Sequence, residues 1–162
     1  LESQFEAAAA TARPVNLHSR RAERATLEAA IRFRKRTGLP AQMHWFTHSR
    51  KMVRIAGEAG VHISVGPSLI DSEETARVVA EIPDHLLLLE TDTPVPIGGI
   101  PNHPARVAEV AASVSRVKGW TLEETSRQTE ENLERFLARL QRDCHGLGNR
   151  CITNYLHLLA GS

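Results

Sequence analysis

The sequence contains few aromatic residues and only two cysteines. Aromatic residues make up 4% of its 162 residues, so the core must be built mainly from aliphatic side chains. Cys144 and Cys151 are too few for a disulfide framework, and we therefore expect a reducing compartment, the cytoplasm. No apolar run approaches the ~20 residues that a membrane-spanning helix needs, and no signal-peptide pattern opens the chain. These absences argue against a small disulfide-rich scaffold and predict no membrane partner.

The chain also lacks an excess of charge of either sign. It has 20 lysines and arginines against 19 acidic residues, which gives a formal net charge of +1 at pH 7. This balance gives nucleic-acid binding no independent support, although basic side chains can still cluster locally. The chain begins with Leu1 inside a helical pattern, and we expect the natural N-terminus to lie upstream. The length suits one domain or part of a larger one.

Helical and strand patterns alternate along the chain. Apolar segments at 14–18, 41–46, 61–65 and 85–90 predict four strands. Helices are predicted in the segments 3–12, 21–38, 49–60, 71–82, 107–117 and 121–140. We predict capping boxes from Asp71 to Glu74 and from Thr121 to Glu124. Alternation of this kind indicates an α/β fold with a parallel sheet.

The last part of the chain departs from this alternation. We expect residues 1–140 to form one domain and residues 141–162 to be an appended tail. The tail contains Cys144, His145, Cys151 and His157. Their spacing fits no standard zinc finger, so a packed helical tail is the favoured interpretation.

Polar residues lie where the predicted strands end. His18 ends the first strand, His44 lies in the second, and Asp92 follows the fourth. Ligands of parallel α/β folds bind beyond the carboxyl ends of the strands, where these side chains should meet. Two imidazoles and a carboxylate suit zinc or another divalent ion. Such an ion lowers the pKa of bound water to roughly 7, and Asp92 can both ligate the ion and accept the proton of the attacking water.

Each of these residues also has a simpler interpretation. On pattern alone, His18 and His44 are better explained as surface or hydrogen-bonded histidines than as metal ligands. Asp92 precedes Thr-Pro and can be a turn former. His62 lies on the strand face opposite its apolar neighbours, and we expect it to be structural. Three further histidines are expected in solvent: His48, His85 and His103.

Six segments, taken in order, resemble motifs of the TatD-type metal-dependent hydrolases. They are PVNLHSRRA, MHWFTHS, HISVGPSLI, IPDHLLLLETDTP, the NHP of 102–104, and TEENLERF. The resemblance covers residues 2 to about 137. It implies the C-terminal half of a TIM barrel, strands five to eight, in the amidohydrolase-like group. It also implies one or two divalent ions (Zn, Mg or Mn) and hydrolysis of phosphodiesters, usually DNA.

The resemblance assigns roles to individual residues. His18 and His44 fall on the histidines that ligate metal, and Asp92 falls on the aspartate that is both ligand and water activator. Glu90 and Arg20 resemble supporting residues around the ligands. The position of His48 is often glycine in relatives, and VPIGGIP at 95–101 replaces a frequent Arg-Gly, so the substrate pocket is less determined than the ligands.

The family's H-x-H and G-E-x-G-L-D motifs are absent from this sequence. They belong to the N-terminal half of the barrel and supply about half the ligands of a two-metal centre, so we expect the chain alone to be inactive. A TIM barrel typically has ~250 residues. We therefore expect a fragment of a longer protein, a half completed by a second copy or partner, or a prematurely opened reading frame.

Two other functions stay open at this point. The chain can be a non-catalytic half-barrel that acts as an assembly partner, or an amidohydrolase that cleaves amides or esters. The second alternative shares the same metal chemistry, because the choice of bond depends on loops that motifs do not specify. An open half-barrel is also expected to leave two unpaired strand edges and an uncovered apolar face.

Overall fold

The four strands form one parallel sheet. A computed structural model describes residues 1–46 and 49–144, with only the backbone described over 139–144. The strands are β1 (Val15–Leu17), β2 (Ala41–Met43), β3 (His62–Val65) and β4 (Leu87–Leu89), and they follow one another in the order β1-β2-β3-β4. All three pairings are parallel. The predicted α/β fold with four parallel strands is confirmed.

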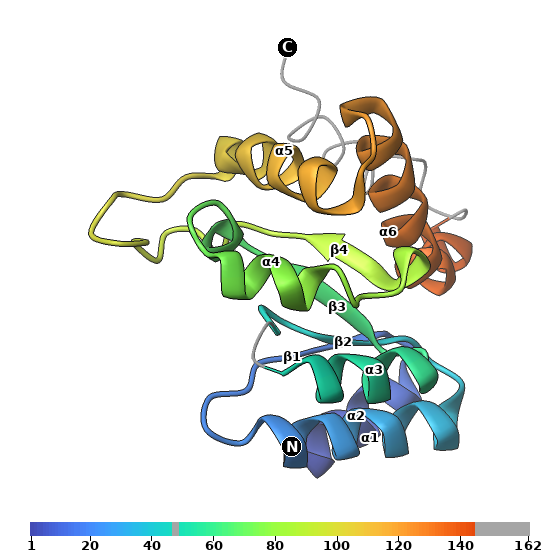
Figure 1. The fold of residues 1–162 in the computed structure, drawn as a ribbon. Coiled ribbons are helices and arrows are strands. Elements are labelled where there is room, and N and C mark those ends of the chain that lie inside the picture. The colour runs from blue at the N-terminus through green and yellow to red at the C-terminus, as the bar shows by residue number, and fades with distance from the viewer. Residues whose placement is uncertain (47–48, 145–162) are drawn as a thin grey trace.

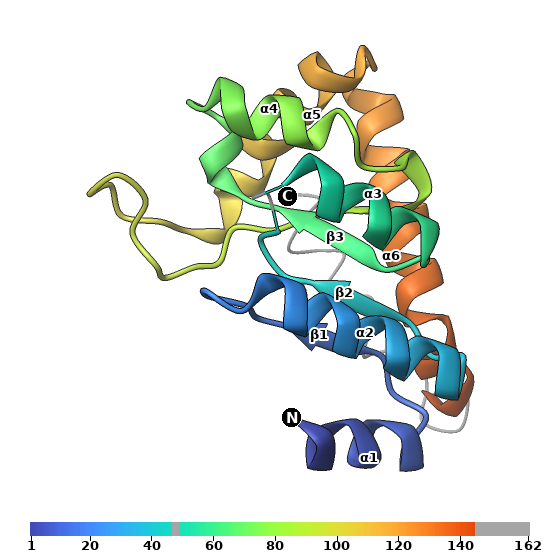
Figure 2. The ribbon, with the colours of Figure 1, turned by 60° about the horizontal axis from the view of Figure 1, so that its bottom comes forward.

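Helices connect the strands and cover them (Figure 1). The α-helices are α1 (Glu2–Ala10), α2 (Glu23–Thr37), α3 (Arg50–Glu58), α4 (Glu73–Val79), α5 (Val107–Lys118) and α6 (Leu122–Cys144). Short 3-10 helices are η1 (Pro67–Leu69), η2 (Asp84–Leu86) and η3 (Pro104–Arg106). Figure 2 shows α1 beneath the β1 end of the sheet, α5 at the β4 end, and α6 running along the side of the sheet from one end toward the other. None of the helices described over 1–46 and 49–144 is long and apolar enough to cross a membrane.

The two faces of the sheet differ in polarity. The register places Leu17, Met43, Ile63 and Leu87 in one row across the four strands. All four are buried in one cluster with apolar side chains of the helices. Because successive side chains alternate between faces, the neighbouring row of Asn16, Gln42 and His62 lies on the other face. That face is therefore polar on β1, β2 and β3, whereas β4 contributes the apolar Leu88 to it.

The prediction of an uncovered apolar face is wrong. The large exposed apolar residues within 1–46 and 49–144 are Leu1, Ile55, Val95, Ile100 and Leu122, and none lies on a strand. The helices cover the apolar face of the sheet, and on the opposite, mainly polar face His62 is buried against Phe136 of α6. β1 and β4 are the outer strands, each with one pairing in the described sheet, which agrees with the expected open edges.

Some predicted element boundaries need correction. The second strand ends at Met43, because Trp45 turns the backbone at φ 46° and donates its N–H to Ser64 Oγ at 3.2 Å. The capping box at Asp71 is wrong, since the hydroxyl of Ser72 accepts the N–H of Thr75 at 3.1 Å and begins α4.

The capping box at Thr121 is confirmed. The N–H of Glu124 donates to the Thr121 hydroxyl at 3.1 Å, and the Glu124 carboxylate accepts the Thr121 N–H at 2.7 Å. The α6 helix that follows runs to Cys144, beyond the predicted domain boundary at residue 140, which stays a prediction. The tail residues 145–162 and His48 lie outside the described residues.

Candidate metal centre

The three predicted ligands lie at the carboxyl edge of the sheet. His18 follows β1, His44 follows β2, and Asp92 comes three residues after β4. The N–H of His44 donates to Leu17 O at 2.9 Å and extends the ladder between these strands. The imidazole rings of His18 and His44 consequently lie side by side, with centroids 5.6 Å apart.

His44 lies between two carboxylates. Its Nδ1 lies 2.6 Å from Oε2 of Glu90, and its Nε2 lies 3.3 Å from Oδ1 of Asp92. The side chains of His44 and Glu90 are each 14% exposed, so water competes little for this contact. The hydrogen bond with Glu90 raises the pKa of His44, and the negative charges of Glu90 and Asp92 add to this rise, whereas burial opposes it.

Small residues on β3 and directly after it let His44 and Glu90 meet across an intervening strand. Glu90 extends β4 through a hydrogen bond from its N–H to Val65 O at 3.0 Å. Ser64 and Gly66 lie on the same face between the two side chains, because β3 pairs with both β2 and β4. A Cβ atom at Gly66 would lie 3.5 Å from the Trp45 ring and 3.7 Å from Glu90 Cγ, so little room remains for a larger side chain.

A hydrogen-bonded loop fixes Asp92. Its backbone lies in the left-handed region at φ 55°, which is uncommon for a residue other than glycine. The Asp92 carbonyl accepts the N–H of Val95 at 3.0 Å. Asn102, which is buried, donates its side-chain amide to Thr91 O and accepts the Thr93 hydroxyl on its backbone oxygen at 3.0 Å. These bonds hold the Asp92 carboxylate toward His44.

The donor atoms suit a divalent cation but do not form a complete ligand cage. Glu90 is hydrogen-bonded to Nδ1 of His44, and Nε2 faces the carboxylate of Asp92. In metal sites, a ligating histidine usually has its other ring nitrogen hydrogen-bonded to a carboxylate in the same manner. Oε1 of Glu90 is buried without a hydrogen-bond partner in the described part of the chain. Within that same part, no group of three or more His, Cys, Asp or Glu residues is arranged to hold a metal ion. Further ligands are therefore needed.

The supporting residues and the other histidines that the sequence singled out differ in their burial and contacts. Arg20 is exposed after β1, and Glu90 contacts His44 directly, as a supporting residue does. His62 is buried, whereas His85 and His103 are exposed, as expected.

The sequence did not predict several residues that shape the site: Trp45, Ser64, Ser68 and Asn102. Trp45 Nε1 donates to Ser68 Oγ at 2.9 Å, a contact that no sequence spacing indicates. Asn102 belongs to the NHP segment, which was the only signal for it.

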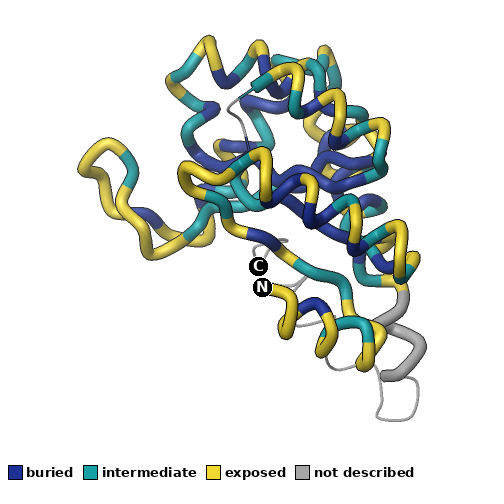
Figure 3. Tube along the Cα trace, turned by 90° about the horizontal axis from the view of Figure 1, so that it is seen from below, coloured by how far each residue is buried: buried dark blue, intermediate teal, exposed yellow. Residues whose placement is uncertain are grey.

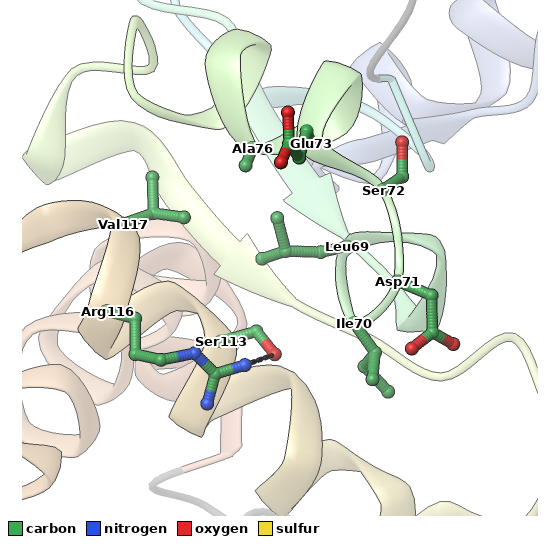
Figure 4. A pocket seen from close by; sticks show the side chains of 9 residues that line it. All are labelled: Leu69, Ile70, Asp71, Ser72, Glu73, Ala76, Ser113, Arg116 and Val117. Carbon is green, nitrogen blue, oxygen red and sulfur yellow. Dashed lines mark hydrogen bonds between the residues drawn. The ribbon is translucent and has the colours of Figure 1, made fainter.

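A pocket lies on the outer surface, away from the candidate metal centre (Figure 4). It has a volume of about 380 Å³ and lies between η1 and α4 on one side and α5 on the other. Arg116 and Ser113 line it and share a hydrogen bond of 2.8 Å. None of the three predicted ligands lines this pocket, so it is separate from the candidate metal centre.

Comparison with solved structures confirms the barrel. The crystal structure of YJJV, a TatD homolog from Escherichia coli K12, matches with a TM-score of 0.76 and 27% identity. The match covers 84% of this chain and 54% of that chain. The predicted fold class, part of a TIM-type barrel with four parallel strands, is thereby confirmed.

Sequence comparison finds relatives of about twice the length. The metal-dependent hydrolase YabD of Bacillus subtilis, itself uncharacterized, is 33% identical over 132 residues, which are 76% of this chain and 50% of YabD. The human deoxyribonuclease TATDN3 is 28% identical over 130 residues, which are 79% of this chain and 46% of TATDN3. The chain thus spans about half the length of these relatives. The family model described as TatD related DNase matches residues 1–138, and the chain belongs to this family.

Proposed function

We propose that the protein containing this chain is a metal-dependent hydrolase that cleaves phosphodiester bonds, with DNA as its substrate. The observation that carries the proposal is the placement of His44 between Glu90 and Asp92, with Nε2 facing the Asp92 carboxylate. Family membership supports the reaction class, and the names of YabD and human TATDN3 support the metal and the DNA substrate.

Each residue of the candidate site has a defined role in this proposal. The Glu90 carboxylate accepts the Nδ1 proton of His44, so the Nε2 lone pair is free to bind a cation. His18 supplies the second imidazole, and Asp92 supplies a carboxylate oxygen. Asp92 also accepts the proton of the water that attacks phosphorus. The cation (Zn²⁺, Mg²⁺ or Mn²⁺, as one or two ions) supplies Lewis acidity and acidifies water.

The proposal also needs groups that bind phosphate and complete the ligand set. Arg20 and Arg21 are exposed immediately after β1, at the edge that carries His18. Guanidinium groups match the geometry of phosphate oxygens, so we assign them to the substrate backbone. The missing ligands come from the residues that complete the barrel, either the N-terminal half of a longer polypeptide or a second copy of this chain. The cytoplasmic location expected from the two cysteines is part of the same proposal.

Substitution of Asp92 tests the proposal. In the full-length protein loaded with Mg²⁺, Mn²⁺ or Zn²⁺, Asp92→Asn should lower the rate of DNA cleavage by about 100-fold or more, because the proton acceptor is lost. Asp71→Asn, at an exposed position on the outer surface, is the matched control and should cleave at the wild-type rate. Full activity of Asp92→Asn would remove the assigned role. Hydrolysis of amides or esters without cleavage of DNA would support the amidohydrolase alternative.

A further inference from the structure

An apolar hairpin projects from the carboxyl edge next to Asp92. It comprises residues 95–101 and follows Asp92 by three residues. The N–H of Ile97 donates to Ile100 O at 3.1 Å, and the N–H of Ile100 donates to Ile97 O at 2.9 Å. Gly98 and Gly99 form the two-residue turn at φ 57° and 78°. Positive φ at both central residues is the geometry of a tight β-hairpin turn, which glycine adopts without strain.

The tip of this hairpin is exposed in spite of its composition. Figures 1 and 3 show the segment extending away from the body of the molecule, and most of it is drawn as exposed. Val95 is 47% exposed and Ile100 is 60% exposed. No heavy atom of another segment lies within 4 Å of the place where a Cβ would stand on Gly98 or Gly99. Exposed apolar side chains on a projecting element indicate an interaction surface.

The base of the hairpin, in contrast, is firmly held. Asn102 is 8% exposed and its amide donates to Thr91 O. Pro94, Pro96 and Pro101 further restrict the backbone on both sides of the turn. The hairpin is therefore a restrained projection, and its binding to a ligand involves a small loss of conformational entropy.

We propose that the apolar hairpin packs against nucleobases of the DNA strand that is cut, beside the scissile phosphodiester. This inference rests on the proposed function. Residues 93–102 contain no charged side chain, so the hairpin cannot neutralise phosphates, and its apolar side chains suit the uncharged part of a nucleic acid. Proteins use isoleucine and proline in this way, as apolar wedges against base steps.

The distance between the hairpin and the candidate metal centre fits this contact. Ile97 follows Asp92 by five residues, so it lies within about 18 Å of it. Since stacked bases are ~3.4 Å apart along a strand, the hairpin reaches bases within about five nucleotides of the phosphate at Asp92. Arg20 and Arg21, at the other end of the same edge, would hold the backbone.

A comparison of normal and abasic DNA tests the proposal. Two single-stranded oligonucleotides of equal length are used with the metal-loaded full-length protein, and one carries tetrahydrofuran residues in place of its terminal nucleosides. Binding is measured by fluorescence anisotropy, and cleavage is measured in parallel. We expect the wild type to bind the normal oligonucleotide at least fivefold more tightly than the abasic one.

Substitution of the hairpin should remove this preference. The double variant Val95→Ser, Ile100→Ser is expected to lose about tenfold in affinity for the normal oligonucleotide, because apolar burial is lost, and little for the abasic one. The single variant Ile100→Phe should keep or strengthen the preference of the wild type, since an aromatic ring stacks on bases. The control is Ile55→Ser, Leu122→Ser, which removes two other exposed apolar side chains on α3 and α6 and should behave as the wild type.

Three results would overturn the proposal. They are equal binding of both oligonucleotides by the wild type, an unchanged preference in the hairpin variant, and a loss of thermal stability in that variant well beyond the control. The last result would mean that the hairpin packs against the part of the protein that completes the barrel. Base-dependent binding without any cleavage would reject the proposed function while supporting the hairpin contact, so the two failures are distinguishable.

Discussion

At the scale of single residues, His62 makes stability depend on pH. It lies on the polar face of the sheet, is 6% exposed, and packs edge-on against the ring of Phe136 with centroids 5.2 Å apart. Burial lowers its pKa to about 4, and the positive charges of Arg34, His85 and Arg135 act in the same direction. The neutral ring is therefore the form that the fold accommodates.

Acidification should destabilise the protein through His62. Between pH 6.5 and about 4 the unfolded state binds a proton at this residue and the folded state does not, so the free energy of unfolding falls as pH falls. The expected contribution between pH 7.5 and 4.5 is about 2 kcal/mol. Urea denaturation at both pH values measures it, and His62→Gln should have a pH dependence smaller by this amount. An equal pH dependence in His62→Gln would show that other groups cause the effect.

The sequence predicted where the three candidate ligands lie better than it predicted their contacts. His18, His44 and Asp92 could be found because each follows an apolar strand, and parallel strands end at one edge of a sheet. The contact of His44 with Glu90 could not be found in this way. It reaches across β3, and it depends on the small side chain of Ser64 and on the absence of a side chain at Gly66. The spacing of these residues in the sequence does not predict such a contact.

At the scale of elements, polar side chains determine where helices begin and how they dock. Asn132 on α6 is fully buried and donates to Asp84 O at 2.6 Å and Leu87 O at 2.7 Å. Its own Oδ1 accepts a hydrogen bond from Gln128 at 3.0 Å. One side chain thereby joins α6 to the start of β4, the strand that leads to Glu90 and Asp92.

Loss of Asn132 should destabilise the fold. Asn132→Ala leaves the buried carbonyl of Leu87 and the partly buried carbonyl of Asp84 without this donor, and the free energy of unfolding should fall by about 3 kcal/mol. Asn16→Ala is the control, because Asn16 is exposed on β1 and should change stability little. Denaturant titration of both variants provides the comparison, and equal stabilities would contradict the role given to Asn132.

The start of α4 provides a second test at this scale. Ser72→Ala should destabilise the protein by about 1 kcal/mol, since the N–H of Thr75 loses its acceptor. Asp71→Ala, one residue earlier, should have a much smaller effect. Thermal or chemical denaturation of both variants measures the two effects. A larger loss of stability in Asp71→Ala than in Ser72→Ala would support the capping box that the sequence predicted at Asp71. The sequence favoured Asp71 because Glu74 follows it by three residues, which is the spacing of a capping box. Ser72 is followed at that spacing by Thr75, which cannot complete such a box.

At the scale of the whole molecule, the chain brings the proposed metal ligands to one edge of its sheet. The four strands bring two imidazoles and a carboxylate to one edge, while β1 and β4 are the outer strands of the described sheet. Relatives of about twice the length share this unit with the chain. The sequence predicted this arrangement because the strand and helix alternation is strong. It could not predict that the face opposite the apolar row is mainly polar, since strands this short do not show which side their helices cover.

The most direct measurement is an anomalous diffraction map of the full-length protein crystallised with Zn²⁺ or Mn²⁺. We predict a peak bonded to Nε2 of His44, to a carboxylate oxygen of Asp92 and to His18, at about 2.0–2.2 Å for zinc. The peak should disappear in the His44→Ala variant. An ion that binds elsewhere, or a peak at this edge that persists in His44→Ala, would contradict the assignment of these three residues as metal ligands.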